Sequence, residues 1–294
     1  MNNEIYAFKL IPKYNLDTIG RLMSLINEPN ILKRFKNQNN FIPKIISYFR
    51  DYENMYIITT LFDGQTLFDL NLRTLSEKKI KFIISCLIIS LKYIRMQGVI
   101  HRDITLKNII IDKDYYFNLI DFSFAVDYYN RNNIDLKCNF IDFTTPPELI
   151  NNSEIDYNFD YYRLGFIIFF LIVNKPPWKY NHISNITDFI LMSNIKRKYS
   201  NELLDLLIRL FKKDIKERIG YKNIVEIQSH PWFREINFNN IEKKRIISPF
   251  KNIKYKKRNI ICSTAFEKSP KLIENYINLT KAHSFLKIVK FFDN

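Results

Sequence analysis

Two consecutive stretches, HRDITLKN (101–108) and IIIDKDYYFNLIDF (109–122), decide the fold of this chain. The second has an apolar run, a short polar turn and another largely apolar run, which is the pattern of two antiparallel strands joined as a hairpin. Because the ends of such a hairpin meet, we expect Asn108 and Asp121 to lie side by side although they are thirteen positions apart (121 − 108). An amide oxygen and a carboxylate that converge beside Asp103 would form a magnesium site next to a general base.

These residues resemble a known catalytic loop. HRDITLKN matches the H-R-D-x-x-x-x-N loop of the eukaryotic protein kinases, and DFS (121–123) stands where that family has D-F-G. The resemblance implies an α+β, two-lobed protein-kinase fold that uses ATP and Mg²⁺. By the same resemblance, Asp103 would orient the substrate hydroxyl and accept its proton, while Asn108 and Asp121 would hold magnesium.

Residues upstream fit the same family pattern. Lys9 falls where the family has the strand lysine that holds the α- and β-phosphates. Glu28, nineteen residues on (28 − 9), falls where the helix glutamate pairs with that lysine. Thr60 to Phe62 would offer hinge backbone to adenine. The resemblance thus implies a nucleotide site that includes Lys9, Glu28, Thr60 and Phe62.

Stretches further along extend the resemblance to roughly residues 6 to 250. PPEL (146–149) resembles the A-P-E stretch, and Arg218 falls where an arginine makes a buried pair with that glutamate. DYYRLG (160–165) resembles the D-x-W-x-x-G start of a helix. Four stretches resemble the cyclic-nucleotide-dependent and related Ser/Thr kinases: FIPKIISYFRDYENMYIITTLFDGQTLF (41–68), IDFSFAV (120–126), NKPPW (174–178), and RIGYKNIVEIQSHPWFREINFNNI (218–241) with the SPF that follows it (248–250).

Local patterns outline the elements of the first half. Residues 6–11 predict a strand, residues 17–27 an amphipathic helix, and residues 44–49 and 55–60 a β-hairpin. From residue 76 onward the pattern becomes mainly helical. Ser76 can cap a long helix there, and Gly98 can close it.

A small sheet-rich lobe is therefore expected to precede a larger helical one. We divide the chain into a reduced N-lobe (1–62), a C-lobe (63–234) and a C-terminal tail (235–294), which by the resemblance would lie back over the small lobe. The apolar runs 82–91 and 164–173 are only ten residues long, whereas a membrane span needs about 20. We expect both to be buried core helices and no membrane span.

The first departure from the family pattern concerns glycine. Only eight residues precede Lys9, and the five glycines of the chain all lie downstream, so the Gly-x-Gly-x-x-Gly loop is missing from this sequence. We expect weaker nucleotide binding and a wetter site. Three explanations stay open: a truncated gene product, a true start further upstream, or a degenerate kinase.

The second departure is Thr105, which stands where the family has a lysine that contacts the γ-phosphate. Lys107 stands four places after Asp103, where tyrosine-kinase loops of the form H-R-D-L-A-A-R-N put their cation. Lys107 would then neutralise the transferring phosphoryl group from a shifted anchor point. The alternative, given equal weight, is a solvated loop lysine.

Two further departures affect the helix and the activation segment. Pro29 follows Glu28 directly, and proline inside a helix removes a hydrogen bond, so we expect Glu28 at a kink or helix end. Residues 126–145 lack the T-x-C-G-T-P-E run of the resembled branch. Ser123 in place of glycine stiffens a turn but leaves the carboxylate of Asp121.

Composition bears on the cellular compartment and on the kind of partner that the protein binds. The three cysteines are far apart and form no C-x-x-C pair, and no secretory signal is visible, so we expect an intracellular protein, cytoplasmic or nuclear. The net charge of +15 has two interpretations. One is an anionic partner; the other, favoured because no arginine-rich motif accompanies the charge, is lysine scattered over a solvated surface.

The sequence thus predicts transfer of the ATP γ-phosphoryl group to Ser or Thr of protein substrates. The alternative is a catalytically weak or dead scaffold, and nucleic-acid binding by the basic tail (251–259) is a third interpretation that we do not favour. Related kinases select arginine with acidic side chains. The matching positions here are Thr66, Lys107 and Phe170, none of them acidic, so we expect substrates that are not arginine-directed.

Overall fold

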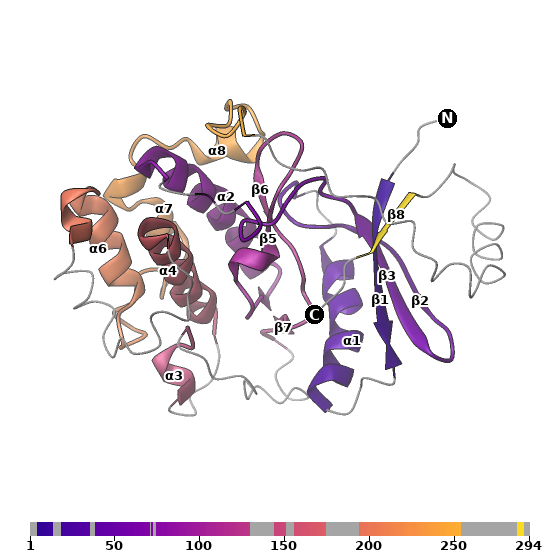
Figure 1. The fold of residues 1–294 in the computed structure, drawn as a ribbon. Helices are drawn as coiled ribbons and strands as arrows, with labels where there is room; N and C mark the ends of the chain where they lie inside the picture. Colours follow the sequence, from indigo (N-terminus) through magenta and orange to yellow (C-terminus); the bar gives the residue numbers. More distant parts are fainter. Residues whose placement is uncertain are drawn as a thin grey trace.

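The computed structural model describes residues 5–13, 19–35, 39–70, 72, 75–129, 144–150, 156–174, 194–253 and 287–290. A sheet with one long helix lies at one side of the molecule, and most of the other helices lie at the opposite side (Figure 1). Among the residues so described, no helix is both long enough and apolar enough to cross a bilayer.

The sheet has the strand order β2-β3-β1-β8. Strands β1 (Ile5–Pro12), β2 (Ile45–Arg50) and β3 (Asn54–Thr60) pair antiparallel, which confirms the predicted strand and hairpin. Asp51 builds the hairpin turn, because its Oδ1 accepts hydrogen bonds from two backbone N–H groups that follow it. The register places Lys9 opposite Ile57 on β3.

The C-terminal end of the chain supplies the fourth strand of this sheet. β8 (Lys287–Lys290) pairs with β1 in parallel, with Ile5 opposite Lys287 and Phe8 opposite Lys290. A strand from near each end of the chain therefore pairs in one sheet, and β1 has a partner on each side.

Helix α1 (Ile19–Arg34) is longer than the sequence predicts. It continues through Pro29 for another turn, so of the two expectations for Glu28, a kink or a helix end, the helix end was wrong. The residues after Pro29 explain the difference, since Ile31 and Leu32 are buried in the main core and hold the last turn against it. Tertiary packing outweighs the local cost of the proline here.

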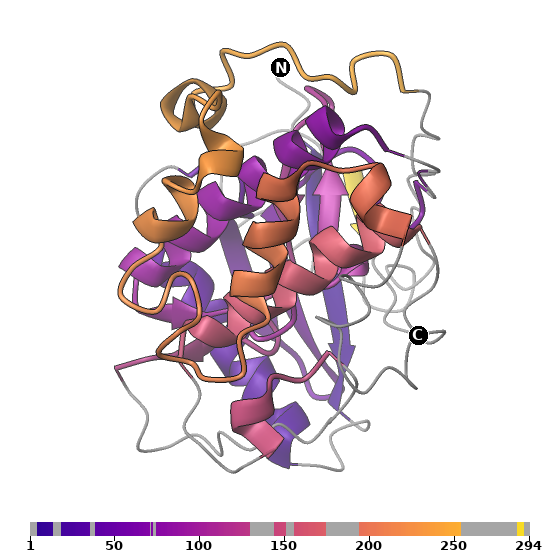
Figure 2. The same ribbon diagram turned by 90° about the vertical axis from the view of Figure 1, so that its left-hand side faces the viewer.

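The long helices of the second half confirm the two predicted core segments. They are α2 (Glu77–Met96) and α4 (Asn158–Val173), which contact each other, and α6 (Asn201–Leu210), which contacts α4. Figure 2 shows these helices in front of the sheet. Residues 164–172 of α4 are all buried, as expected for a helix that is apolar on every side.

The ends of α2 follow the sequence prediction in position. Ser76 is the N-cap residue, but its side chain makes no capping hydrogen bond; its carbonyl accepts from Lys79 and Ile80. Gly98 follows the helix with φ of 70°, a left-handed conformation that glycine adopts at little cost. The ring of Tyr129 lies where a Cβ at this position would be, so close packing requires glycine as well.

Shorter elements complete the helical side. They are α3 (Pro147–Ile150), α7 (Val225–Gln228), α8 (Phe238–Glu242) and the 3₁₀ turns η2 (Leu106–Asn108), η5 (Asn194–Arg197) and η6 (Pro231–Phe233). Two small antiparallel sheets lie between the main sheet and these helices. One pairs β4 (Val99–Ile100) with β7 (Val126–Asp127), and the other pairs β5 (Ile109–Ile111) with β6 (Phe117–Leu119).

A buried ion pair joins distant parts of the helical side. The guanidinium of Arg218 donates from Nη1 to Oε1 of Glu148 at 2.6 Å and from Nη2 to Oε2 at 2.8 Å. The same guanidinium also donates to the carbonyl oxygens of Asn158 and Lys212. This bidentate pair, expected from the sequence, connects α3 to the start of α4 and to the loop after α6.

Candidate active site

A cavity of about 410 Å³ lies between the main sheet and the β5–β6 hairpin, which is within the usual size of a small-molecule site. Its lining comes from β1, α1, β3, the connection after β3 and the hairpin. Seven of the eight residues that the sequence singles out for catalysis, nucleotide or metal binding line it: Lys9, Glu28, Thr60, Phe62, Lys107, Asn108 and Asp121.

Lys9 is held between two carboxylates in this cavity. Its Nζ lies 3.1 Å from Oε2 of Glu28 and 2.9 Å from Oδ1 of Asp121. The Glu28 side chain lies on α1 and the Asp121 side chain follows the β5–β6 hairpin, so one lysine joins three elements. Oε1 of Glu28 also accepts the backbone N–H of Phe122 at 3.3 Å, which makes the connection between α1 and residues 121–122 twofold.

Burial and the lysine act in opposite directions on the two acids. Glu28 is only 4% exposed, and burial raises its pKa above the usual value although Lys9 opposes the shift. For Asp121, burial also favours protonation, but the nearby ammonium of Lys9 and hydrogen bonds from Ser123 outweigh it and lower its pKa to about 2. Asp121 is therefore ionised at neutral pH, as a metal ligand must be.

The catalytic-loop stretch is anchored by Asp160, the first acid of α4. Its two carboxylate oxygens accept the backbone N–H groups of His101 at 2.8 Å and Arg102 at 2.9 Å. Arg102 has a φ of 64° and Asp121 one of 62°, left-handed values that are uncommon outside glycine and that concentrate at functional sites. The surrounding contacts hold both residues in this conformation.

His101 is fully buried and orients the residue that follows it by two positions. Its Nδ1 accepts the backbone N–H of Asp103 at 3.2 Å, so its ring proton lies on Nε2, which is 3.1 Å from the carbonyl oxygen of Ile120. Burial lowers the pKa of His101, which agrees with a neutral ring. His101 thus ties the Asp103 backbone to the strand end beside Asp121.

Asn108 fixes the carboxylate of Asp103. Its Nδ2 donates to Oδ2 of Asp103 at 2.7 Å and to the carbonyl oxygen of the same residue at 3.0 Å. The carbonyl of Asn108 accepts the N–H of Ile120 at 2.9 Å, so the hairpin brings Asn108 beside Asp121 as its pattern predicts. Since Nδ2 of Asn108 donates to Asp103, the Oδ1 atom is the one that Asn108 can offer to a metal ion.

The oxygen atoms of Asp121 and Asn108 suit a magnesium ion that is also bound by phosphate and water better than they suit a metal ion bound by protein side chains alone. Among the described residues, no group of three or more His, Cys, Asp or Glu side chains could hold a metal ion. One carboxylate and one amide oxygen are what a Mg²⁺ ion needs when phosphate and water supply its remaining ligands. Asp121 and Asn108 provide that pair on the lining of the cavity.

The backbone N–H of Thr60 is already bonded within the protein, although the sequence resemblance implies that residues 60–62 offer their backbone to adenine. Its backbone N–H donates to the carbonyl of Lys44 at 2.9 Å, and its hydroxyl accepts the N–H of the same residue at 3.0 Å. A backbone donor for adenine must therefore come from beyond Thr60, and Phe62 is the next lining residue along the chain.

Lys107 is exposed at the edge of the cavity. It lines the cavity, and its Nζ lies 5.6 Å from the ring centroid of Phe68. Thr105 is the residue before η2, and its carbonyl accepts the N–H of Asn108 at 3.1 Å. Its observed role is therefore to stabilise the backbone turn of the loop. Of these two positions, Lys107 is the one whose side chain lines the cavity.

Sequence reasoning missed one acid at the cavity. Asp69 lines it, and its Oδ2 accepts the hydroxyl of Thr66 at 2.7 Å while its backbone N–H donates back to that hydroxyl at 3.1 Å. The T-x-x-D spacing was the available signal, because this spacing favours reciprocal side-chain to backbone bonds. Phe170, matched by register to a substrate-contact position, is instead buried in the core of α4.

Three stretches of the sequence argument lie outside the described residues. They are residues 130–143 of the activation segment, residues 175–178 of NKPPW and residues 254–259 of the basic tail. Before them, Tyr128 donates its backbone N–H to the carbonyl of Gly98 at 2.7 Å, and Arg34 of α1 forms an ion pair with Asp127.

The protein kinase domain model matches residues 1–233, so this chain belongs to the protein kinase domain family. Among curated proteins, it is 28% identical over 255 residues to the cAMP-dependent protein kinase catalytic subunit of Schizosaccharomyces pombe, an alignment that covers 85% of this chain and 49% of that one. It is 26% identical over 258 residues to a probable serine/threonine-protein kinase of Dictyostelium discoideum, covering 84% and 55%.

A third relative is cGMP-dependent protein kinase 2 of Mus musculus, 26% identical over 259 residues, with 85% of this chain and 33% of that one covered. The chain thus spans about half the length, or less, of these relatives. Their names agree with the branch that the sequence resembles, at modest identity.

Proposed function

We propose that this protein is a serine/threonine-protein kinase that transfers the γ-phosphoryl group of ATP to protein hydroxyls with the help of Mg²⁺. The observation that carries the proposal is the convergence on one cavity of Lys9, Glu28, Asn108 and Asp121, with Asp103 bonded to Asn108. Membership in the protein kinase family and the printed names of the relatives support the choice of Ser or Thr.

In this proposal each side chain has a separate task. Lys9 binds the α- and β-phosphates, and Glu28 holds its ammonium group in place. Asn108 and Asp121 hold the magnesium ion, which supplies positive charge beside the phosphates. Asp103 accepts a hydrogen bond from the substrate hydroxyl and takes its proton as the hydroxyl attacks.

The finer features of the fold belong to the same proposal. We place the N-lobe in residues 1–62, the C-lobe in residues 63–234 and the tail in residues 235–294. The N-lobe would be reduced to the strands β1, β2 and β3 with α1, and β8 of the tail would complete its sheet.

The test is an array of Ser- and Thr-containing peptides incubated with the protein, labelled ATP and Mg²⁺. We expect label on the hydroxyl side chains of the peptides. Chelation of Mg²⁺ is expected to abolish this labelling, because no ion held by Asn108 and Asp121 then offsets the negative charge of the phosphates. No label above a protein-free control, over a full range of Mg²⁺ and Mn²⁺, would favour the alternative of a kinase-like binding scaffold.

The same array tests substrate choice. Lys107 places an ammonium group at the cavity edge, and the Asp69 carboxylate on the same lining accepts a hydrogen bond from the hydroxyl of Thr66. Like charges placed together suppress a partner, so we expect peptides with neutral or acidic surroundings to be preferred. Enrichment of arginine two or three places before the labelled residue would contradict this specificity without contradicting the kinase activity.

Lys107→Ala is expected to lower kcat by roughly 10²–10³-fold, the effect of removing one electrostatic donor from a transition state. The reason is that Lys107 is the cation that the loop places at the cavity. Adding Thr105→Lys to this variant is expected to restore part of the loss. Steady-state kinetics of the two variants would measure both effects.

Lys113→Ala is the matched control, since Lys113 is an exposed lysine at the far end of the same hairpin. It is expected to leave kcat unchanged. If Lys107→Ala has the kcat of Lys113→Ala, Lys107 is a solvated loop lysine and has no part in the phosphoryl transfer.

A further inference from the structure

The β5–β6 hairpin carries the proposed metal ligands but is too small to be rigid by itself. Each strand has three residues, and the pair forms a sheet of its own, with one isolated bridge from Ile110 to Thr66. A two-stranded hairpin is marginally stable in water without outside support. Asn108 and Asp121 flank one end of it, so whatever holds its other end also holds the spacing of the two ligands.

The other end of the hairpin is a turn organised by Asp112, which is only 4% exposed. Its Oδ1 accepts the N–H groups of Asp114 and Tyr116, both at 2.9 Å. Its Oδ2 accepts Nδ2 of Asn118 at 3.1 Å. A buried carboxylate of this kind needs a cation as well as hydrogen bonds to be tolerated.

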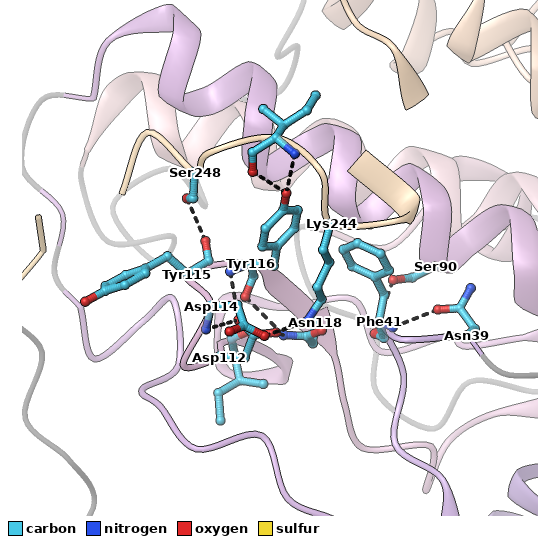
Figure 3. A network of polar contacts seen from close by, with 12 residues as sticks. Asn39, Phe41, Ser90, Asp112, Asp114, Tyr115, Tyr116, Asn118, Lys244 and Ser248 are labelled. Atoms are coloured by element: carbon cyan, nitrogen blue, oxygen red, sulfur yellow. Dashed lines mark hydrogen bonds and ion pairs between the residues drawn. The ribbon is translucent and has the colours of Figure 1, made fainter. Parts of the chain in front are cut away.

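Lys244 supplies that cation from a distant part of the chain. Its Nζ lies 2.5 Å from Oδ2 of Asp112 and 3.6 Å from Oδ2 of Asp114. The ammonium also lies over two aromatic rings, 5.4 Å from the centroid of Tyr116 and 5.8 Å from that of Phe41. Figure 3 shows Lys244 reaching down from the segment after α8 into this group.

The rest of that segment, residues 244–250, is docked on the same turn. The hydroxyl of Tyr116 donates to the carbonyl of Ile246 and accepts its N–H, at 2.5 and 3.2 Å, and Ser248 donates its hydroxyl to the carbonyl of Tyr115 at 2.8 Å (Figure 3). Phe250 is fully buried, with its ring 4.9 Å from that of Phe117 on β6.

The network also reaches the chain that follows α1. The carbonyl of Phe41 accepts the N–H of Leu119 at 2.9 Å. The same carbonyl accepts the hydroxyl of Ser90 at 3.4 Å, and the N–H of Phe41 donates to Asn39 (Figure 3). Leu119 lies two residues before Asp121. The ring of Phe41 lies beneath the Lys244 ammonium, so one cation contacts both the turn and the segment that supports the strand next to the metal site.

We propose that Lys244 is a positioning residue for magnesium binding: by clamping Asp112 and Phe41 it fixes the β5–β6 hairpin and, through it, the separation of Asn108 and Asp121. The inference rests on the proposed function for its meaning in catalysis. Groups that orient metal ligands from outside the coordination sphere change metal affinity or activity by about 10–100-fold when they are removed.

The test compares Lys244→Met, which keeps the length and apolar stem of the side chain but removes its charge, with two controls. Lys243→Met makes the same change at the exposed neighbouring lysine, and Lys244→Arg keeps the charge. For each protein, calorimetry would give the Mg²⁺ concentration at which a non-hydrolysable ATP analogue is half bound, and kinetics would give that for half-maximal turnover. Hydrogen exchange of the Leu119 and Ile120 amides would report on the hairpin without nucleotide.

We expect Lys244→Met to raise both half-saturating Mg²⁺ concentrations about tenfold or more, with faster exchange of these two amides while the amides of α4 stay protected. Lys243→Met should match the wild type, and Lys244→Arg should recover most of the affinity. An unchanged Mg²⁺ requirement would overturn the inference, and so would an equal loss of protection throughout the protein, which indicates a general structural role.

The failure of this inference can be told apart from the failure of the proposed function. A wild-type protein that binds the magnesium–analogue complex but transfers no phosphate would overturn the kinase proposal alone. The calorimetric comparison of Lys244→Met with Lys243→Met would still test the role of Lys244, because it measures magnesium binding without turnover. A wild-type protein that binds no magnesium–analogue complex would overturn both.

Discussion

Asp103→Asn is expected to lower kcat by about 10²–10⁴-fold, the range for loss of a general base. Asparagine has the shape of aspartate, and its amide oxygen can still accept the 2.7 Å hydrogen bond from Asn108, so the loop should keep its conformation. What is lost is the ability to take the proton from the substrate hydroxyl. Asp121→Asn should abolish turnover as well, because it removes the proposed metal ligand, a carboxylate that is ionised at neutral pH since its pKa is about 2.

The two variants should differ in their dependence on magnesium. Asp103→Asn is expected to keep the wild-type Mg²⁺ requirement, whereas Asp121→Asn is expected to need far more Mg²⁺ for any residual rate. Asp63→Asn, the same exchange at an exposed acid, serves as the control, and thermal melts would verify that all three proteins are folded. An Asp103→Asn protein that retains more than roughly a tenth of the wild-type kcat would exclude Asp103 as the base.

Arg218→Ala is expected to reduce the free energy of unfolding by about 3–5 kcal/mol. The Arg218 side chain is 0% exposed and that of Glu148 is 8% exposed, so the substitution leaves a carboxylate buried with no counter-charge. It also removes the donors to the carbonyl oxygens of Asn158 and Lys212, which lie at the start of α4 and after α6. For a protein of this size the melting temperature should fall by roughly 6–20 °C.

Arg209→Ala provides a contrast within the same protein. Arg209 pairs with Asp205 one turn earlier on α6, and the two side chains are 55% and 46% exposed, so water screens the pair and its loss should cost less than about 1 kcal/mol. Replacing both buried partners by Glu148→Gln and Arg218→Met should cost less than Arg218→Ala alone, since no charge is then left buried. Similar melting temperatures for Arg218→Ala and Arg209→Ala would refute the argument.

Local sequence patterns predicted the elements that depend on neighbours in the chain. The hairpin of β2 and β3 followed from alternating apolar residues on both sides of a polar turn, and the β5–β6 hairpin from the same logic. Because a hairpin fixes which residues face each other, the approach of Asn108 to Asp121 was also predictable. The family resemblance, rather than any local pattern, pointed to Lys9 and Glu28.

The end of α1 could not be predicted in this way. A proline after Glu28 predicts a helix end, since it removes a backbone donor and crowds the preceding turn. The helix continues because Ile31, Leu32 and Phe35 have a core to pack against, and that core is made by residues from other parts of the chain. The energy that decides the helix length therefore comes from contacts that local rules do not contain.

By itself the sequence determined the short-range geometry: which segments are strands, which are helices, and which polar residues the hairpin ends bring together. Only the tertiary structure decided the pairings across long separations, such as Lys9 with Asp121, 112 positions apart, and Lys244 with Asp112, 132 positions apart. Nothing in the residues near Lys244 indicates a buried carboxylate as its partner. Such a pair forms because burying Asp112 makes a nearby cation necessary, and burial is a property of the whole fold.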